Sequence, residues 1–131
     1  MAQKDVELIL MRQCASHLSM AIFLVDRDGR LIYYNEPAEA ILGRRFDDAG
    51  EMMVSDLAEL FETHEEDGRP IPSDQLPLGI AMMQRRPSFK RIRFTALDGT
   101  ERLIEVTALP LEGEGGLWLG SVAFFWEAHT G

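Results

Sequence analysis

The chain begins with a segment whose apolar residues follow helical spacing. These residues form two overlapping sets between positions 5 and 18. The sets are Val6, Leu10, Cys14 and Leu18, and Leu8, Met11, Ala15 and Leu18. The combined apolar arc is wider than one stripe, which predicts a helix covered on two sides, by its own domain and by a second copy of the chain. An ordinary core helix is the alternative.

Two short strands and a helix are predicted next. Residues 21–26 form an apolar run rich in strand-forming residues, and residues 30–35 form a second such run. Asp28-Gly29 between them is typical of a hairpin turn, because glycine adopts the positive φ that such turns often need. Asn35 can then cap a helix over residues 36–42, and the glycine that follows ends this helix.

The sequence pattern after residue 43 predicts two further helices. Periodicity is weak after residue 43, but Ser55 can cap a short helix over residues 56–61. A longer helix is expected to start within residues 73–75, because Pro77 lacks an N–H and is tolerated only in a first turn. This helix is expected to run to about Arg86, since a proline follows.

The last third of the chain predicts three strands, over residues 89–96, 102–109 and 117–126. The connections between them are too short for crossover helices, so neighbouring strands should pair antiparallel. Together with the first two strands they predict an α+β fold, a five-stranded antiparallel sheet with helices gathered on one face.

The length and net charge of the chain limit the number of domains and the class of binding partner. The chain has 131 residues and a net charge of −9. One domain is expected, with a terminal helix over residues 1–20, a main unit over 21–127 and a tail over 128–131. The acidic balance argues against direct nucleic-acid binding, which needs a surplus of Lys and Arg. The single cysteine cannot form an internal disulfide.

No segment is expected to enter a membrane. The longest stretch without Asp, Glu, Lys or Arg covers the thirteen residues 13–25, whereas a spanning helix needs about 20 apolar residues. The first seven residues include two acids where a signal peptide would have its basic region. A cytoplasmic location is therefore expected.

The order of these elements, and several short motifs within them, resemble the PAS domain. The resemblance covers roughly residues 15 to 127 and rests on order and spacing. The motifs are AIFLVDRDGRLIYYNEPA at 21–38, ILG at 41–43, DGRPIP at 67–72, LPL at 76–78, DG at 98–99 and ALPL at 108–111. PAS domains are sensory modules of many bacterial signalling proteins, among them histidine kinases and transcription regulators. The resemblance implies a module that binds a small ligand or a partner and relays a conformational change.

In PAS domains small ligands sit between the sheet and the helices. Alternation along the strands selects the residues expected to line such a site. They are Ile22, Leu24, Leu31, Tyr33, Ile92, Phe94, Ile104, Val106, Val122 and Phe124, with Met82 and Met83 from the helix. A small apolar ligand is expected there, and a packed core without a ligand is the alternative. A buried Tyr33 or Tyr34 would need a partner for its hydroxyl, either a ligand or a backbone carbonyl.

The resemblance also implies a relay at the end of the last strand. Many PAS domains end this strand with Asp-Ile-Thr, and Glu127-Ala128-His129 stands there in this chain. Glu127 keeps the carboxylate, but His129 replaces the threonine. Trp126 and Glu127 are the expected relay residues. The expected partners are a second copy of the chain and an output domain or a separate signalling protein.

Haem and flavin are not expected as cofactors. Haem-binding relatives often place an axial histidine on the long helix, and none lies between residues 74 and 86. Relatives that form a light-driven flavin adduct need a cysteine in the middle helical region, whereas Cys14 lies near the amino terminus. Cys14 is better explained as a small apolar core residue.

Metal binding and catalysis are not expected either. The acidic run Glu62, Glu65, Glu66 and Asp67 lacks the ligand spacing of a calcium loop and is explained as a solvated run. No nucleophile elbow or phosphate-binding glycine loop is present. A small cavity enzyme is a weaker alternative. A basic cluster is open to two interpretations, solvation or contact with an acidic partner. It contains Arg85, Arg86, Lys90, Arg91 and Arg93.

Overall fold

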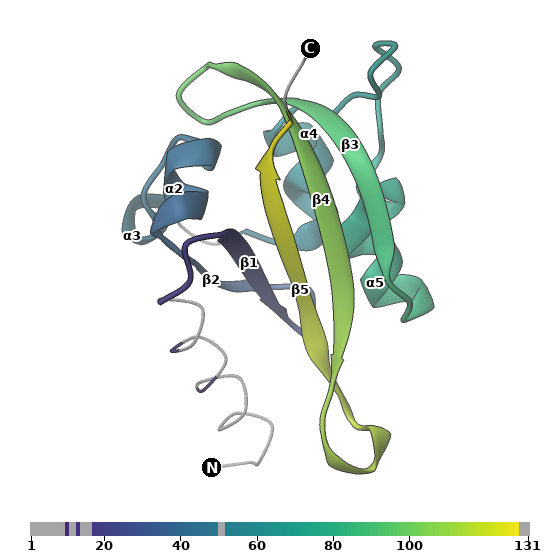
Figure 1. Ribbon diagram of the computed structural model, residues 1–131. Coiled ribbons are helices and arrows are strands. Elements are labelled where there is room, and N and C mark those ends of the chain that lie inside the picture. Colours follow the sequence, from purple (N-terminus) through teal and green to yellow (C-terminus); the bar gives the residue numbers. More distant parts are fainter. Residues whose placement is uncertain (1–9, 11–12, 14–16, 50–51, 129–131) are drawn as a thin grey trace.

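The computed structural model describes residues 10, 13, 17–49 and 52–128. Five strands form one antiparallel sheet in the order β2-β1-β5-β4-β3 (Figure 1). They are β1 (Ala21–Asp26), β2 (Leu31–Tyr34), β3 (Ser88–Thr95), β4 (Glu101–Glu112) and β5 (Trp118–Glu127). The predicted five-stranded sheet is confirmed. The helix predicted over residues 5–18, with Cys14, lies mostly outside the described residues, and His129 lies wholly outside them.

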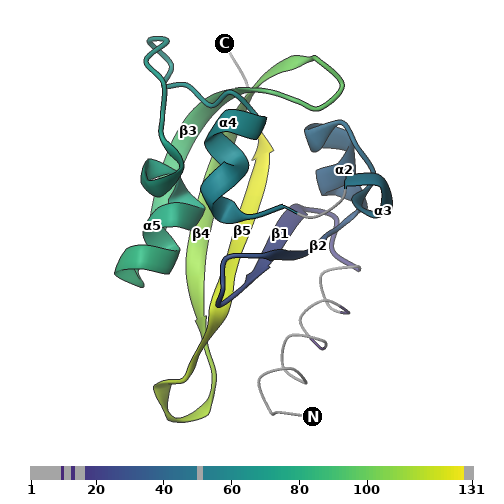
Figure 2. The same cartoon turned by 180° about the vertical axis from the view of Figure 1, so that it is seen from behind.

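The helices cover one face of the sheet (Figure 2). They are α2 (Glu36–Leu42), α3 (Phe46–Ala49), α4 (Leu57–Leu60) and α5 (Pro77–Gln84), with short 3-10 turns η1 (Val54–Asp56), η2 (Ser73–Gln75) and η3 (Glu114–Gly116). α4 and α5 lie over the half of the sheet that contains β3, β4 and β5, whereas α2 and α3 lie beside β1 and β2 (Figure 2). Within the described ranges, no helix combines the length and hydropathy needed to cross a bilayer.

Asn35 begins α2 and also ties it to the sheet. Its Oδ1 accepts hydrogen bonds from the backbone N–H of Ala38, at 3.2 Å, and of Ile22, at 3.0 Å. Its Nδ2 donates to the carbonyl of Met20 at 2.9 Å. Gly43 ends the helix in the left-handed region, with φ of 83°. The predicted cap and end of this helix are therefore confirmed.

The helix predicted over residues 56–61 is found over residues 54–60, with a 3-10 first turn, and its predicted cap is wrong. The helical part is η1 followed by α4, and no side chain caps either of them at its first residue. The side chain that reaches this helix belongs instead to Ser73, whose Oγ accepts a hydrogen bond from the Ala58 N–H at 2.9 Å. Ser55 stays exposed. The cap comes from another part of the chain, so local sequence could not reveal it.

The longer predicted helix is divided into two parts. Residues 73–75 form the separate turn η2, and Leu76 has an extended backbone, with ψ of 152°. α5 therefore begins at Pro77 itself, which suits proline because the first helical N–H has no partner within the helix. The helix ends at Gln84, two residues earlier than predicted, because Arg85 adopts the left-handed conformation.

Apolar side chains are buried on both faces of the sheet. The inner face, which the helices cover, carries a large core that includes Ile104, Val106 and Ala108 of β4, and the predicted alternation along this strand is confirmed. The opposite face carries a smaller group, here called the outer cluster. It contains the buried Ile22, Leu24 and Val122 and the partly buried Ile32, Tyr33, Leu109, Leu111 and Phe124. Burying one such side chain fully stabilises the fold by roughly 1.5–3 kcal/mol.

Candidate ligand cavity

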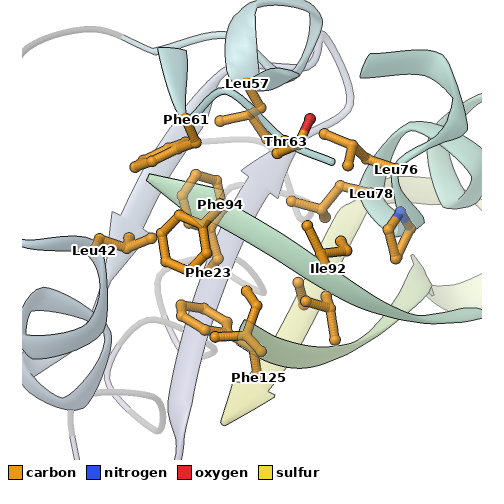
Figure 3. Close-up of a pocket in the computed structure, with 14 residues that line it drawn as sticks. Phe23, Leu42, Leu57, Phe61, Thr63, Leu76, Leu78, Ile92, Phe94 and Phe125 are labelled. Atoms are coloured by element: carbon orange, nitrogen blue, oxygen red, sulfur yellow. The ribbon is translucent and has the colours of Figure 1, made fainter. Parts of the chain in front are cut away.

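A small cavity lies between the inner face of the sheet and the helices. Its volume is about 80 Å³. From the sheet it is lined by Phe23, Ile92, Phe94, Ile104, Val106, Ala123 and Phe125. From the helical side it is lined by Leu42, Leu57, Phe61, Thr63, Leu76, Pro77 and Leu78 (Figure 3). The cavity therefore lies in the position that the resemblance implies for a ligand.

The lining is apolar apart from one hydroxyl group. Phe61 and Phe94 meet edge to face, with ring centroids 5.7 Å apart and an interplanar angle of 75°. The hydroxyl of Thr63 donates to the carbonyl of Ile71 at 2.8 Å. The lining contains no charged side chain that could pair with a charged ligand.

Strand register decides which residues of β1 and β5 face the cavity. Directly paired residues in an antiparallel sheet lie on the same face. Val106 of β4 pairs with Phe125 of β5, and Ala123 of β5 pairs with Phe23 of β1. Because Val106 faces the helices, the residues paired with it face the helices too.

The structure brings together only part of the predicted lining. Phe94, Ile104 and Val106 line the cavity, as does Ile92. The face assigned to Leu24, Val122 and Phe124 is wrong, because these residues, like Ile22, lie in the outer cluster on the opposite face. β1 and β5 are apolar on both faces, so alternation could not choose between the two faces.

Four other predicted lining residues also lie elsewhere. Leu31 is buried in the inner core but does not reach the cavity. Tyr33 packs against the outer cluster, and its ring meets that of Phe46 edge to face at 5.4 Å. Met83 is 72% exposed on α5, and Met82 is partly buried outside the lining. Neither methionine of this helix therefore lines the cavity.

The helical side of the lining was missed by sequence reasoning. Leu57 and Phe61 lie on one side of the predicted short helix, and this spacing is the only local signal for them. Phe23, Ala123 and Phe125 could have been found from β4. Its one-sided pattern fixes the inner face, but the pairing of β4 with β5 was needed to transfer that face to β5.

Tyr34 is fully buried, and its hydroxyl does not face a ligand. It donates to the carbonyl of Arg44 at 2.8 Å, while the ring stacks on Phe23 at 5.9 Å. Burial first, and then the charge of Glu39, raise the pKa of Tyr34 from 10.0 to about 12. Two partners were expected for this hydroxyl, a ligand or a backbone carbonyl, and the structure shows the carbonyl.

The end of β5 is held to β4 by two side-chain contacts. The indole N–H of Trp126 donates to Glu105 Oε1 at 2.9 Å. Glu127 Oε1 and Arg102 Nη1 form an ion pair at 2.7 Å. Arg102 also donates to the carbonyl of Ala40 in α2, at 3.5 Å. The two predicted relay residues therefore lie at a junction between β4, β5 and α2.

The cavity does not fit a haem or a flavin. A volume of about 80 Å³ is far too small for either group, and its lining includes no imidazole or thiol. Within the part of the chain that the structure describes, no group of three or more His, Cys, Asp or Glu residues could hold a metal ion.

Solved PAS domains have a similar fold. The PAS domain of a protein from Colwellia psychrerythraea matches with a TM-score of 0.64 and 19% identity, covering 93% of this chain and 97% of that chain. The PAS domain of nitrogen regulation protein NR(II) from Vibrio parahaemolyticus matches with a TM-score of 0.62 and 16% identity, covering 91% and 98%. The PAS domain of BvgS from Bordetella pertussis matches with a TM-score of 0.59 and 15% identity, covering 95% and 87%. At these identities the likeness shows the fold.

The sequence itself supports the same assignment. A comparison with curated proteins found no match. The PAS fold family, in contrast, matches residues 10–127. This region includes all five strands and the helices that enclose the cavity. The chain therefore belongs to the PAS family.

Proposed function

We propose that this PAS domain is a sensory module that binds a small apolar molecule in the cavity and relays the change to the end of β5. The apolar cavity on the inner face is the observation that carries the proposal. The matching family is a fold family and not an enzyme family, and we propose no catalytic role. One similar structure is the PAS domain of a two-component sensor histidine kinase. By analogy, we propose that the change acts on an output domain or a separate signalling protein.

The size of the cavity limits the ligand. An engineered apolar cavity of about 150 Å³ takes up benzene, and the cavity here has about half that volume, about 80 Å³. The ligand should therefore have only a few heavy atoms and no charge, because a buried charge without a partner is strongly unfavourable.

The relay runs along β5. Phe125 lines the cavity, and Trp126 and Glu127 follow it directly. A ligand that displaces the Phe125 ring therefore acts on the strand segment whose next two residues contact Glu105 and Arg102. The indole N–H of Trp126 gives a separate NMR signal that reports this junction.

A matched pair of variants tests both steps with xenon as the apolar probe. Val106→Ile adds one methylene to the cavity lining, and Val122→Ile adds one to the outer cluster. Xenon should shift the methyl signals of the lining and the indole signal of Trp126 in the wild type and in Val122→Ile. In Val106→Ile both shifts should be several-fold smaller. Equal shifts in the two variants would refute the cavity as the binding site.

A structural domain without a ligand is the competing function. Native mass spectrometry of the full chain, purified from its source, should find a retained small molecule of low mass. A protein that carries no small molecule and gives no xenon shift would favour the competing function.

We also propose that the module is a homodimer formed through the amino-terminal segment. Leu10, Leu18 and Met20 are each about half exposed, which is costly for large apolar side chains that lie close together in sequence. The double variant Leu10→Glu, Leu18→Glu should become monomeric in light scattering. Leu60 is an exposed leucine of α4, outside the amino-terminal segment. Leu60→Glu introduces the same charge there and should leave the dimer intact. A wild-type monomer, or a dimer that survives the double variant, would contradict this interface.

A further inference from the structure

β3 is an edge strand, and part of its edge has no partner. It pairs with β4 on one side only. On the other side, Arg93 exchanges two backbone hydrogen bonds with His64, at 2.8 and 2.9 Å, and the Thr95 N–H donates to the carbonyl of Phe61 at 2.8 Å. In an antiparallel pair, alternate residues point their backbone groups to the same side. The N–H and C=O groups of Phe89 and Arg91 therefore point to the free side, where no described residue pairs with them.

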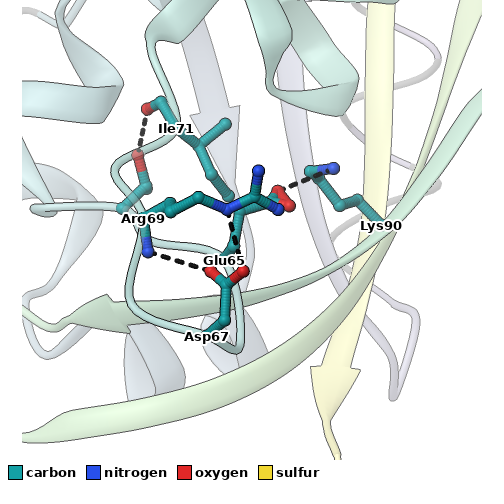
Figure 4. Close-up of polar contacts among 6 residues, drawn as sticks. Glu65, Asp67, Arg69, Ile71 and Lys90 are labelled. Atoms are coloured by element: carbon teal, nitrogen blue, oxygen red, sulfur yellow. Dashed lines mark hydrogen bonds and ion pairs between the residues drawn. The ribbon is translucent and has the colours of Figure 1, made fainter.

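Acidic side chains of the same chain already contact this edge. The turn after His64 places Glu65 Oε1 at 2.8 Å from Lys90 Nζ (Figure 4). Glu66 Oε1 lies 3.3 Å from Arg91 Nε. Neighbouring strand residues point to opposite faces, so the two carboxylates lie on opposite sides of β3. The edge is therefore suited to acidic groups on both faces.

These contacts leave the edge open beside Phe89 and Arg91. The turn folds back on itself, because the Glu65 N–H donates to the carbonyl of Arg69 at 2.7 Å and not to β3. The Arg91 side chain has the 3.3 Å ion pair with Glu66 and stays 38% exposed. Phe89 is 56% exposed and offers an apolar contact next to the free backbone groups.

The charge of this edge is opposite to that of the whole chain. Arg86 precedes β3, and Arg91 and Arg93 follow along it, in a chain of net charge −9. A second copy pairing edge to edge would set these cations against one another, which is unfavourable. An acidic partner meets opposite charges at Arg86 and Arg93, for which no ion pair with a described residue is found, although Glu65 and Glu66 already pair with Lys90 and Arg91.

We propose that the β3 edge from Phe89 to Arg91 accepts an extended acidic segment of a partner protein as an added strand. The backbone of the segment pairs with the free N–H and C=O groups of both residues, as in other cases of strand addition. Phe89, Arg91 and Arg93 share one face of β3. The carboxylates of the segment contact Arg91 and Arg93 on this face, and the aliphatic part of a third acidic side chain covers Phe89. The surface lies on the far edge from β2 and does not depend on the cavity.

The probe is a fluorescent peptide of about eight alternating Glu and Val residues. It should bind the full chain saturably in fluorescence anisotropy, whereas a peptide of alternating Lys and Val should not. Hydrogen exchange followed by NMR should show the amides of Phe89 and Arg91 exchanging quickly in the free protein. Both amides should become protected when the acidic peptide binds.

Two matched pairs of variants separate the backbone from the side chains. Phe89→Pro and Phe89→Ala both remove the ring, but only proline removes the N–H, and an edge position with an outward N–H tolerates proline. The proline variant should bind about tenfold more weakly than the alanine variant. Arg91→Gln should weaken binding severalfold, whereas Arg27→Gln, in the exposed β1–β2 turn, should not. Circular dichroism checks that each variant folds.

Several outcomes would overturn the proposal. They are no saturable binding at millimolar peptide, equal binding of the Lys-Val peptide, unprotected amides at residues 89 and 91, and displacement of the peptide by a single-stranded oligonucleotide. The amide measurement needs no variant, so a misfolded Phe89→Pro protein leaves the test intact. Val106→Ile should bind the peptide like the wild type, which separates this site from the cavity.

Discussion

At the scale of single residues, Tyr34 shows how a buried polar group is accommodated beside an apolar cavity. Its hydroxyl has the Arg44 carbonyl as partner, and its ring stacks on Phe23, which lines the cavity. The residue therefore supports the cavity wall without offering a hydrogen bond to a ligand. Because the pKa of Tyr34 is raised, this role can be measured through the pH dependence of the free energy of unfolding.

Tyr34→Phe should lower the free energy of unfolding by about 1 kcal/mol at neutral pH, since a hydrogen bond is lost and the Arg44 carbonyl is left without it. The pKa of Tyr34 rises from 10.0 to about 12 on folding. Above pH 10 the unfolded chain therefore loses this proton more readily than the folded chain, and the folded state loses stability as pH rises towards 12. Below pH 10 this contribution is constant.

The pH dependence distinguishes the wild type from the variant. The stability of the wild type minus that of Tyr34→Phe should fall as pH rises from about 10 to 12 and pass through zero, because the variant has no proton to lose at this position and two pKa units correspond to about 2.7 kcal/mol. Urea unfolding at several pH values measures it. A difference that stays constant or grows over this range would contradict the assignment.

At the scale of elements, Asn35 does more than cap a helix. The same side chain caps α2 and binds the backbone of Ile22 and Met20 at the start of β1. The first helix that the structure describes in full and the first strand are thus fixed to each other by one amide group. The α2 cap could be read from the sequence, but its contacts with β1 could not.

Asn35→Ala should destabilise the protein by about 2–4 kcal/mol, because a helix cap is lost and the buried Ile22 N–H is left without its partner. Ser55→Ala is the matched control. Ser55 looks like a cap in the sequence but caps no helix in the structure, so its replacement should change stability by less than about 0.5 kcal/mol. Thermal and urea unfolding would show comparable losses for both variants if this assignment were wrong.

Elements with local signals were predicted well, and those fixed by distant contacts were not. Asn35 and Gly43 act on their own neighbours in the chain, so the bounds of α2 follow from the sequence. Pro77 places a helix nearby, but the predicted start within residues 73–75 and end at about Arg86 are wrong, because η2 forms a separate turn and Arg85 is left-handed. The faces of β1 and β5 depend on pairing with strands far away in sequence. Because both strands are apolar on both sides, a shift of one residue exchanges Phe23 with Leu24 and Ala123 with Val122.

At the scale of the whole molecule, the sheet consists of two units joined along one seam. β1 and β2 form a hairpin, and β3, β4 and β5 form a meander. Among the described residues, these two units are joined by one strand pairing, that of β1 with β5. Gly120, paired with Asp26, lies at one end of this seam, where a Cβ atom would collide with the carbonyl oxygen of Val25.

Gly120→Ala should therefore separate β1 from β5 and destabilise the whole fold. Gly99→Ala is the control, since Gly99 also has a positive φ but open space around it. Both variants incur backbone strain, so Gly120→Ala should be the less stable of the two by at least about 2 kcal/mol. Urea unfolding measures the difference. Equal losses would mean that the collision is relieved at little cost.

The pairing of β1 with β5 can form only late in the synthesis of the chain. Ala21 and Phe125, which pair across the seam between the two strands, are about one hundred positions apart in the sequence. At roughly 5–20 residues per second, β1 leaves the ribosome about 5–20 seconds before its partner strand exists. During that interval a strand that is apolar on both faces has β2 and α2 beside it but lacks β5. The newly made chain should therefore need a chaperone until its last strand emerges, although the finished domain is small.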